Sequence, residues 1–174
     1  LCEDGADRST QVDNAKLTAL ADIVDSAAQD GKKLVVIARF LPEINAITRM
    51  LEKKAIGYSL ISGEIRDRDE QVRRFQTDPD TTVFVGQIAT AGMGITLTAA
   101  DTMVFYSLDY SMSNFEQAKA RIHRVGQRNP CTYLYLVAAG TVDEKVLQAL
   151  RDKADLARVL IDEYRAGKNP FQTN

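Results

Sequence analysis

The stretch Leu34-Val35-Val36-Ile37-Ala38 decides the fold class of this 174-residue chain. A short, continuously apolar run of this kind is typical of a β-strand that is buried on both faces, because a strand with one wet face alternates apolar and polar residues. The residues on either side of the run have the periodicity of helices. The run therefore predicts a strand inside a sheet that helices cover.

The same alternation of helix and strand continues along the chain. We expect strands at 34–38, 58–62, 82–85, 102–107 and 132–138, and helices at 13–29, 42–51, 67–77, from 113 onward and from 141 to about 165. Residues 1–12 are polar, and we expect them to be loose. Strands that alternate with helices favour the α/β class, a parallel sheet with helices on both faces. Such sheets place ligand sites at the C-terminal ends of their strands.

Composition narrows the class of protein. A hydrophobic content of 45% and a charged content of 26% are ordinary for a globular domain. The net charge of −2 gives no global sign of nucleic-acid binding, so any such contact must use local patches. Cys2 and Cys131 lack metal-ligand spacing and fit a reducing compartment. Neither a membrane-spanning apolar run nor a signal-peptide pattern is present, so we expect an intracellular location. A start at Leu-Cys-Glu without methionine hints weakly at an excised fragment.

The segment Gln117-Ala-Lys-Ala-Arg121-Ile-His-Arg124-Val-Gly-Gln127 carries the first functional signal. On a helix, Gln117, Arg121 and Arg124 stand at positions 0, +4 and +7 and share one face, at ~100° per residue. We expect a capping box at 113–116 to open this helix and Gly126 to end it. The expected apolar stripe, on another face, consists of Phe115, Ala118, Ile122 and Val125.

Two readings of the arginine pair stay open from these residues alone. Paired guanidiniums on a rigid element suit a polyphosphate, because each is always charged and can bind phosphate oxygens bidentately. If the ligand is ATP, one arginine can stabilise the transferring γ-phosphate as an arginine finger. Alternatively, the two arginines form a solvated helix end that the helix dipole favours.

A glycine-containing segment, 86–97, follows the third expected strand. Gly92 and Gly94 would let the backbone approach a ligand closely. The segment is either a phosphate-binding loop or a tight turn, and a lone Gly-x-Gly does not decide between them.

Three segments, taken in their order along the chain, strongly resemble the second RecA-like lobe of the Swi/Snf-type ATPases. They are 87–101, Asp109-Tyr110 and 117–127. Those proteins are DNA translocases of helicase superfamily two, and the ending His123-Arg124-Val-Gly126-Gln127 is close to a signature of the family. The resemblance covers about 14–165. It implies a RecA-like sheet of the P-loop NTPase kind, with a linker and helix at 1–30, the lobe at 31–140, and a brace helix and tail at 141–174. Departures from the family pattern, which indicate a divergent branch, occur at Arg39, Ala91, Thr96, Tyr110 and Ser111.

The resemblance also implies roles for individual residues. Arg121 and Arg124 would face the γ-phosphate across a cleft, with Arg124 as the finger. The nucleotide side of that cleft would be lined by Gly92, Gly94 and Gln117, and DNA phosphates would be contacted by Gly63, Arg66, Gln87 and Thr90. The ligands of Mg²⁺ are expected on another lobe, and no residue of this chain is expected to bind a metal.

The chain contains neither a Walker A pattern nor an acidic box after a strand, the elements that grip the phosphates and hold Mg²⁺. By itself it is therefore not expected to hydrolyse ATP. We expect this chain to be the C-terminal motor lobe of an ATP-dependent DNA translocase that uses ATP with Mg²⁺. Its expected partners are a first RecA-like lobe and duplex DNA, and no contact with a membrane is expected. The alternatives are a lobe of an RNA-directed helicase of the same superfamily and a non-catalytic RecA-like module that binds a protein.

Overall fold

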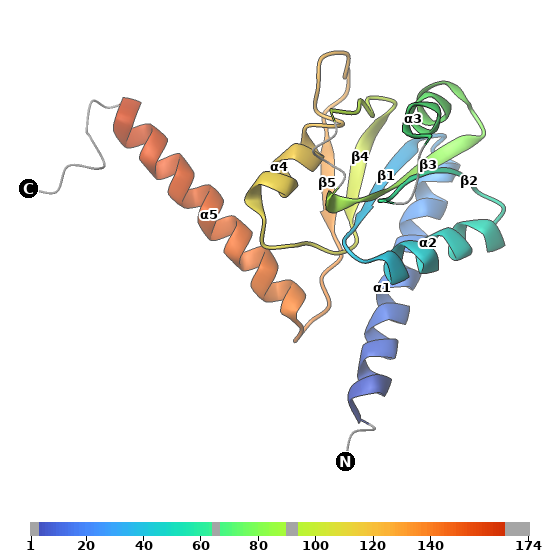
Figure 1. Ribbon diagram of the computed structural model, residues 1–174, viewed down its shortest axis with the longest axis horizontal. Helices are drawn as coiled ribbons and strands as arrows, with labels where there is room; N and C mark the ends of the chain where they lie inside the picture. Colours follow the sequence, from blue (N-terminus) through green and yellow to red (C-terminus); the bar gives the residue numbers. More distant parts are fainter. Residues whose placement is uncertain (1–3, 64–66, 90–93, 166–174) are drawn as a thin grey trace, which may run out of the picture.

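The computed structural model describes residues 4–63, 67–89 and 94–165 of the chain. Its centre is a five-stranded sheet in the order β2-β3-β1-β4-β5, and each pair of neighbouring strands is parallel (Figure 1). The strands are β1 (Lys33–Ala38), β2 (Gly57–Ile61), β3 (Thr81–Gln87), β4 (Ala100–Phe105) and β5 (Thr132–Tyr135). The predicted parallel sheet is thus confirmed.

Five helices accompany the sheet: α1 (Asp4–Gln29), α2 (Leu41–Lys53), α3 (Arg68–Thr77), α4 (Met112–Lys119) and α5 (Val142–Arg165). Helices α1 and α2 pack on one face, and α3, α4 and the first turns of α5 pack on the other. The central strand divides its side chains between the two cores, with Val36 facing α1 and α2 and Val35 facing α3 and α4. Both side chains are 0% exposed, so the prediction of a strand buried on both faces is confirmed.

The first helix is longer than the sequence pattern predicted. Helix α1 begins at Asp4, so the expectation of a loose segment over 1–12 is wrong for residues 4–12. Residues 1–3 lie outside the described part of the chain.

The starts of the last two helices test the predicted caps. The expected capping box at 113–116 is wrong, because α4 starts two residues earlier with Ser111 as its N-cap, whose Oγ accepts the Asn114 N–H at 3.2 Å. The start predicted for α5 is confirmed, since Thr141 Oγ1 accepts the N–H of Asp143 at 3.2 Å.

A half-buried ion pair joins the two terminal helices on opposite faces of the sheet. Lys16 Nζ of α1 lies 2.8 Å from a carboxylate oxygen of Asp143 of α5, and the side chains are 8% and 20% exposed. The ammonium also lies 4.9 Å from the ring centre of Tyr106, just beyond β4. Beyond this anchored start, α5 runs away from the sheet (Figure 1). Its exposed apolar side chains include Leu156 and Val159. None of the helices described here is both long and apolar enough to cross a membrane.

Candidate functional site

The two arginines lie on a loop and not on a helix. Helix α4 ends at Lys119, and Ala120 is its C-cap. The predicted helical face shared by Gln117, Arg121 and Arg124 is therefore wrong. We call residues 120–129 the arginine loop.

A β-turn forms the tip of the arginine loop. The N–H of Gln127 donates to the carbonyl of Arg124 at 3.0 Å, and Gly126 in the third position of the turn has φ +103. A positive φ at this position is the requirement of a type II turn, which glycine meets without steric strain. Gly126 is thus a turn residue and not the predicted helix cap. Val125 is 98% exposed and does not belong to the core, whereas the other members of the predicted apolar stripe, Phe115, Ala118 and Ile122, are buried.

The guanidinium of Arg121 is partly removed from solvent and does not have all of its hydrogen-bond partners within the described part of the chain. Its carbonyl accepts the Leu97 N–H at 2.9 Å, which fixes the backbone, but its buried Nε has no hydrogen-bond partner among the described residues. Loss of solvent lowers the pKa of the Arg121 guanidinium, and the neighbouring positive charge of Arg124 lowers it further. An unsatisfied buried donor costs about 1–3 kcal/mol. Bound anions relieve both the missing hydrogen bond and the repulsion between the arginines.

Arg124 is oriented by the backbone of the glycine-containing segment. Its Nη1 donates to the carbonyls of Gly94 at 2.8 Å and Ile95 at 3.3 Å. Gly94 itself has φ +67. Two of the residues predicted to surround a nucleotide are therefore in direct contact, while Gly92 lies outside the described residues.

Gln117 occupies a different element from the arginines. It remains on α4, where its Nε2 donates to Ser113 Oγ at 2.9 Å. The structure thus brings Gly94 and the arginine loop together, and it leaves Gln117 bonded within its own helix.

A second set of predicted residues lies at the C-terminal ends of the strands. Gly63 follows β2 and Gln87 ends β3, and the Gly63 N–H donates to Gln87 Oε1 at 3.3 Å. Gln87 Nε2 in turn donates to the carbonyl of Arg39, just after β1, at 3.3 Å. Arg66 and Thr90, predicted for the same contact, lie outside the described residues.

Two residues that sequence reasoning missed extend this row of hydrogen bonds to β4. Ser107 Oγ accepts the N–H of Arg39 at 2.7 Å and donates to the carboxylate of Glu43, which also accepts the Phe40 N–H. The glutamate was detectable as the N3 residue of a helix whose first turn holds a proline. The serine had no comparable local signal, because its partners are 64 and 68 residues away in sequence.

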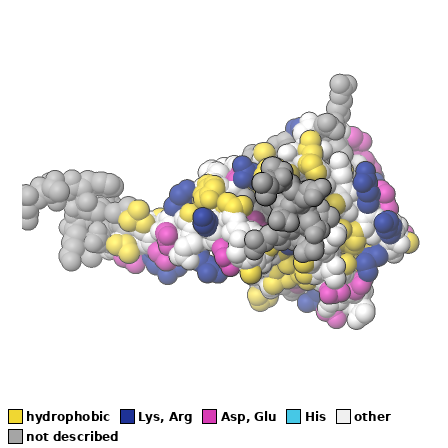
Figure 2. Space-filling view, turned by 90° about the horizontal axis from the view of Figure 1, so that it is seen from below, with side chains coloured by type: hydrophobic (Ala, Val, Ile, Leu, Met, Phe, Trp, Pro, Cys, Tyr) yellow, Lys and Arg dark blue, Asp and Glu magenta, His cyan; other side chains and the backbone are white. Residues whose placement is uncertain are grey.

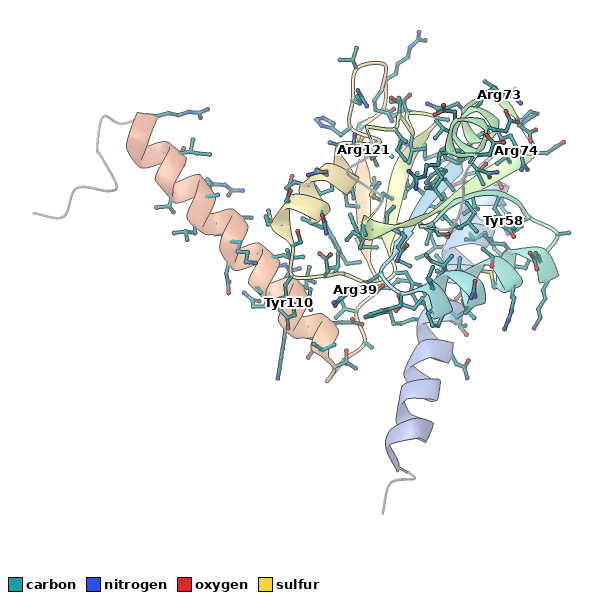
Figure 3. The ribbon with its side chains drawn as sticks, in the orientation of Figure 1. Arg39, Tyr58, Arg73, Arg74, Tyr110 and Arg121 are labelled. Carbon is teal, nitrogen blue, oxygen red and sulfur yellow. The ribbon has the colours of Figure 1, made fainter. Side chains whose placement is uncertain are left out.

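The two sets of residues lie at opposite ends of the sheet. Arg121 lies near the beginnings of β4 and β5, while Arg39 and Tyr110 lie near the strand ends (Figure 3). Gly63 and Gln87 lie at the C-terminal ends of the strands, where the sequence predicted ligand groups, whereas the arginine loop does not. Figure 2 shows the molecule from below, with lysines and arginines in separate groups and hydrophobic side chains exposed on the same face.

The described residues include no group of three or more His, Cys, Asp and Glu side chains that could hold a metal ion. The guanidiniums of Arg121 and Arg124 at one end of the sheet can bind an anion, whereas at the other end the Gly63 N–H is bonded to Gln87 Oε1 and Gln87 Nε2 to the carbonyl of Arg39.

Comparisons with known proteins show the family to which the chain belongs. The family described as "Helicase conserved C-terminal domain" matches residues 15–126. The chain is 36% identical over 152 residues to the chromatin-remodeling ATPase INO80 of Cryptococcus neoformans var. neoformans serotype D (strain B-3501A), an alignment that covers 86% of this chain and 9% of that protein. It is 31% identical over 151 residues to the Mus musculus protein of the same name, covering 86% and 10%. The chain therefore spans about a tenth of the length of these relatives.

Among solved structures, the fold is similar to that of the C-terminal part of the Fun30 ATPase domain. The TM-score is 0.74 at 22% sequence identity, over 78% of this chain and 44% of the other. This similarity supports the RecA-like fold.

Proposed function

This chain belongs to the helicase conserved C-terminal domain family, as a C-terminal lobe of the Swi/Snf type, and from this premise we propose that it is the second motor lobe of an ATP-dependent translocase on duplex DNA. The observation that carries the proposal is the Arg121 side chain. Its guanidinium is partly desolvated, lacks a partner at Nε and lies beside a second cation, Arg124. Such a preformed pair of cations suits the γ-phosphate of a nucleotide that another lobe binds.

In this proposal the lobe contributes charge and orientation to ATP hydrolysis. Arg124 acts as the arginine finger, and its Nη1 bonds to Gly94 and Ile95 hold the guanidinium in place before the nucleotide arrives. Arg121 stabilises the same phosphate, and Gly92, Gly94 and Gln117 line the nucleotide. The ligands of Mg²⁺ and the grip on the β-phosphate come from the first lobe.

The row of groups at the strand ends forms this lobe's part of the DNA track. The backbone of Gly63 and the side chain of Gln87, with Arg66 and Thr90, contact phosphates of one strand. Contacts of this kind follow the DNA backbone without reading base sequence. ATP binding draws the two lobes together and hydrolysis releases them, so that one lobe's phosphate grip shifts relative to the other's.

The test of the proposal is ATP hydrolysis by the longer protein that contains this chain, with and without duplex DNA, beside the chain alone. We expect strong stimulation by duplex DNA in the longer protein and no hydrolysis by the chain alone, because the chain lacks a Walker A motif. Stimulation by RNA in place of DNA would assign the lobe to an RNA-directed helicase. If the longer protein has no ATPase activity, the chain is instead a non-catalytic RecA-like module that binds a protein.

The finger role of Arg124 has its own test. In the longer protein, Arg124→Ala should lower kcat by about 10³-fold or more while nucleotide affinity stays near that of the wild type, because the finger acts on charge that develops in the transition state. Steady-state kinetics and a nucleotide-binding titration measure the two quantities. Near-normal turnover in this variant would refute the assignment.

A further inference from the structure

The side chain of Gln127 holds the arginine loop in place through both polar atoms of its amide group, Nε2 and Oε1. Its Nε2 donates to the carbonyl of Ala100 at 2.7 Å and also lies 3.3 Å from Ile122 O and 3.4 Å from Thr98 O. Its Oε1 accepts the N–H groups of Arg128 at 3.0 Å and Asn129 at 3.1 Å. An amide has two donor hydrogens and two acceptor lone pairs, so these contacts use the whole hydrogen-bonding capacity of the group.

The bonds of Gln127 connect elements that are distant in sequence. Ala100 is the first residue of β4, so the Nε2 bonds tie the end of the arginine loop to the sheet. The backbone of the same loop is held a second time near its beginning, where the Leu97 N–H donates to the carbonyl of Arg121 at 2.9 Å. Arg121 and Arg124 therefore sit between two attachments of the loop to segment 94–100.

We propose that Gln127 is a positioning residue for ATP hydrolysis, which sets the placement of Arg121 and Arg124 by fixing the arginine loop to the start of β4. This inference rests on the proposed function. Neither guanidinium touches Gln127 through a hydrogen bond that the structure describes, so it acts through the loop backbone. A misplacement of ~1 Å in a reacting geometry lowers the rate by about a hundredfold, and a loop that loses its amide attachment can move by that much.

The chain offers a matched control in Gln76 of α3, whose side-chain amide also bonds to this segment. Its Nε2 donates to Thr96 O at 3.1 Å and lies 3.3 Å from Thr98 Oγ1, and its Oε1 accepts the Ala99 N–H at 2.8 Å. These bonds stabilise segment 96–100 but do not reach the arginine loop. If Gln127 served only to stabilise that segment, its loss and the loss of Gln76 would affect catalysis alike.

The experiment measures kcat and KM for ATP in the longer protein carrying Gln127→Ala, Gln127→Glu or Gln76→Ala, together with the melting temperature of each variant. We expect Gln127→Ala to lower kcat by about tenfold to a hundredfold with KM changed by less than about threefold, since loop geometry is lost and ground-state binding is largely kept. Gln76→Ala should lower the melting temperature by a similar amount and keep kcat within about twofold.

The Gln127→Glu variant separates the effect of the donor Nε2 from that of the acceptor Oε1. The carboxylate still accepts the N–H groups of Arg128 and Asn129, but it cannot donate to Ala100 O and places a negative charge against that carbonyl. We expect its kcat to fall at least as far as that of Gln127→Ala. A kcat within about twofold of wild type in both Gln127 variants, or equal losses in the Gln127→Ala and Gln76→Ala proteins, overturns the inference.

Arg124→Ala distinguishes failure of this inference from failure of the proposed function. If Arg124→Ala abolishes turnover and the Gln127 variants do not, only the role of Gln127 is wrong. If Arg124→Ala turns over normally, the finger assignment is wrong and the inference about Gln127 falls with it, while stimulation of ATP hydrolysis by duplex DNA still tests the proposed function separately.

Discussion

Tyr133 shows how the environment of a single residue makes stability depend on pH. It lies on β5, and its hydroxyl donates to the carbonyl of Lys119 at the end of α4, at 3.4 Å. Burial is the largest cause, and the nearby Cys131 a smaller one, of a pKa raised from the ordinary value of 10 to about 12. The folded lobe therefore favours the neutral phenol.

The sign of the pH dependence follows from this shift. Below pH 10 the phenol is neutral in both states. Between about pH 10 and 12 the unfolded chain loses the proton while the folded lobe keeps it, so the free energy of unfolding falls as pH rises through this window. Denaturant unfolding across the window should show a smaller fall for Tyr133→Phe than for the wild type. Tyr110→Phe, at a phenol that is 47% exposed, is the control. Identical pH profiles for Tyr133→Phe and the wild type would contradict the prediction.

At the residue scale, the sequence singled out Arg121 and Arg124 as candidate site residues but did not predict the structure that holds them. The periodicity of Ala118, Ile122 and Val125 predicted a continuous helix, because local patterns contain no information on distant partners. In the structure the carbonyl of Arg121 accepts the Leu97 N–H, a bond between residues 24 positions apart, and the chain turns after Ala120. The bonds that Gln127 makes to Ala100 and Thr98 were equally invisible for the same reason.

At the scale of elements, the Lys16–Asp143 ion pair decides how the two terminal helices are attached. Lys16 is 8% exposed and Asp143 20% exposed, and the Asp143 carboxylate also lies 3.4 Å from the Ala138 N–H. A charge left unpaired in so dry a position is destabilising, more than a lost surface pair would be.

A double-mutant cycle measures this attachment. Lys16→Met should lower the free energy of unfolding by roughly 1–3 kcal/mol, less than a fully buried pair, because it leaves the carboxylate without its cation. Adding Asp143→Asn should restore part of the loss. The exposed pair Lys54–Asp25, with side chains 32% and 45% exposed, is the matched control and should show a coupling below about 1 kcal/mol in the same denaturant titrations. Equal coupling energies for the two pairs would show that burial does not matter here.

Most elements were predictable to within a few residues, since the strands have apolar runs and most helices an apolar stripe, although α3 is a largely charged helix. The start of α1 was not. Residues 4–12 carry no apolar stripe that marks a helix, yet a helix that has nucleated on buried residues such as Leu20 and Val24 extends with little further requirement. The early end of β5 at Tyr135 was also missed, because β-pairing with β4 and not local sequence sets its length.

At the scale of the whole molecule, the resemblance to a family predicted the lobe and its candidate site residues. It did not supply their arrangement at two ends of the sheet, with the arginine loop at the start of β4 and the Gly63–Gln87 contact at the strand ends. That separation arises because the arginine loop leads into the start of β5, whereas Gly63 and Gln87 lie where β2 and β3 end, and all of these strands run parallel.

The strand order also governs when this lobe can fold as it is made. Among the described strands, β1 pairs with β3 and β4, and β2 pairs with β3, so the first two strands have no neighbour until residues 81–87 exist. A nascent chain that has left the ribosome only up to residue 80 carries the apolar run of β1 with nothing to pair with. Parallel pairings of this range form late and leave apolar segments open to aggregation. Chaperones that bind extended apolar segments can therefore bind β1 before β3 emerges. They can no longer do so once β3 has docked between β1 and β2.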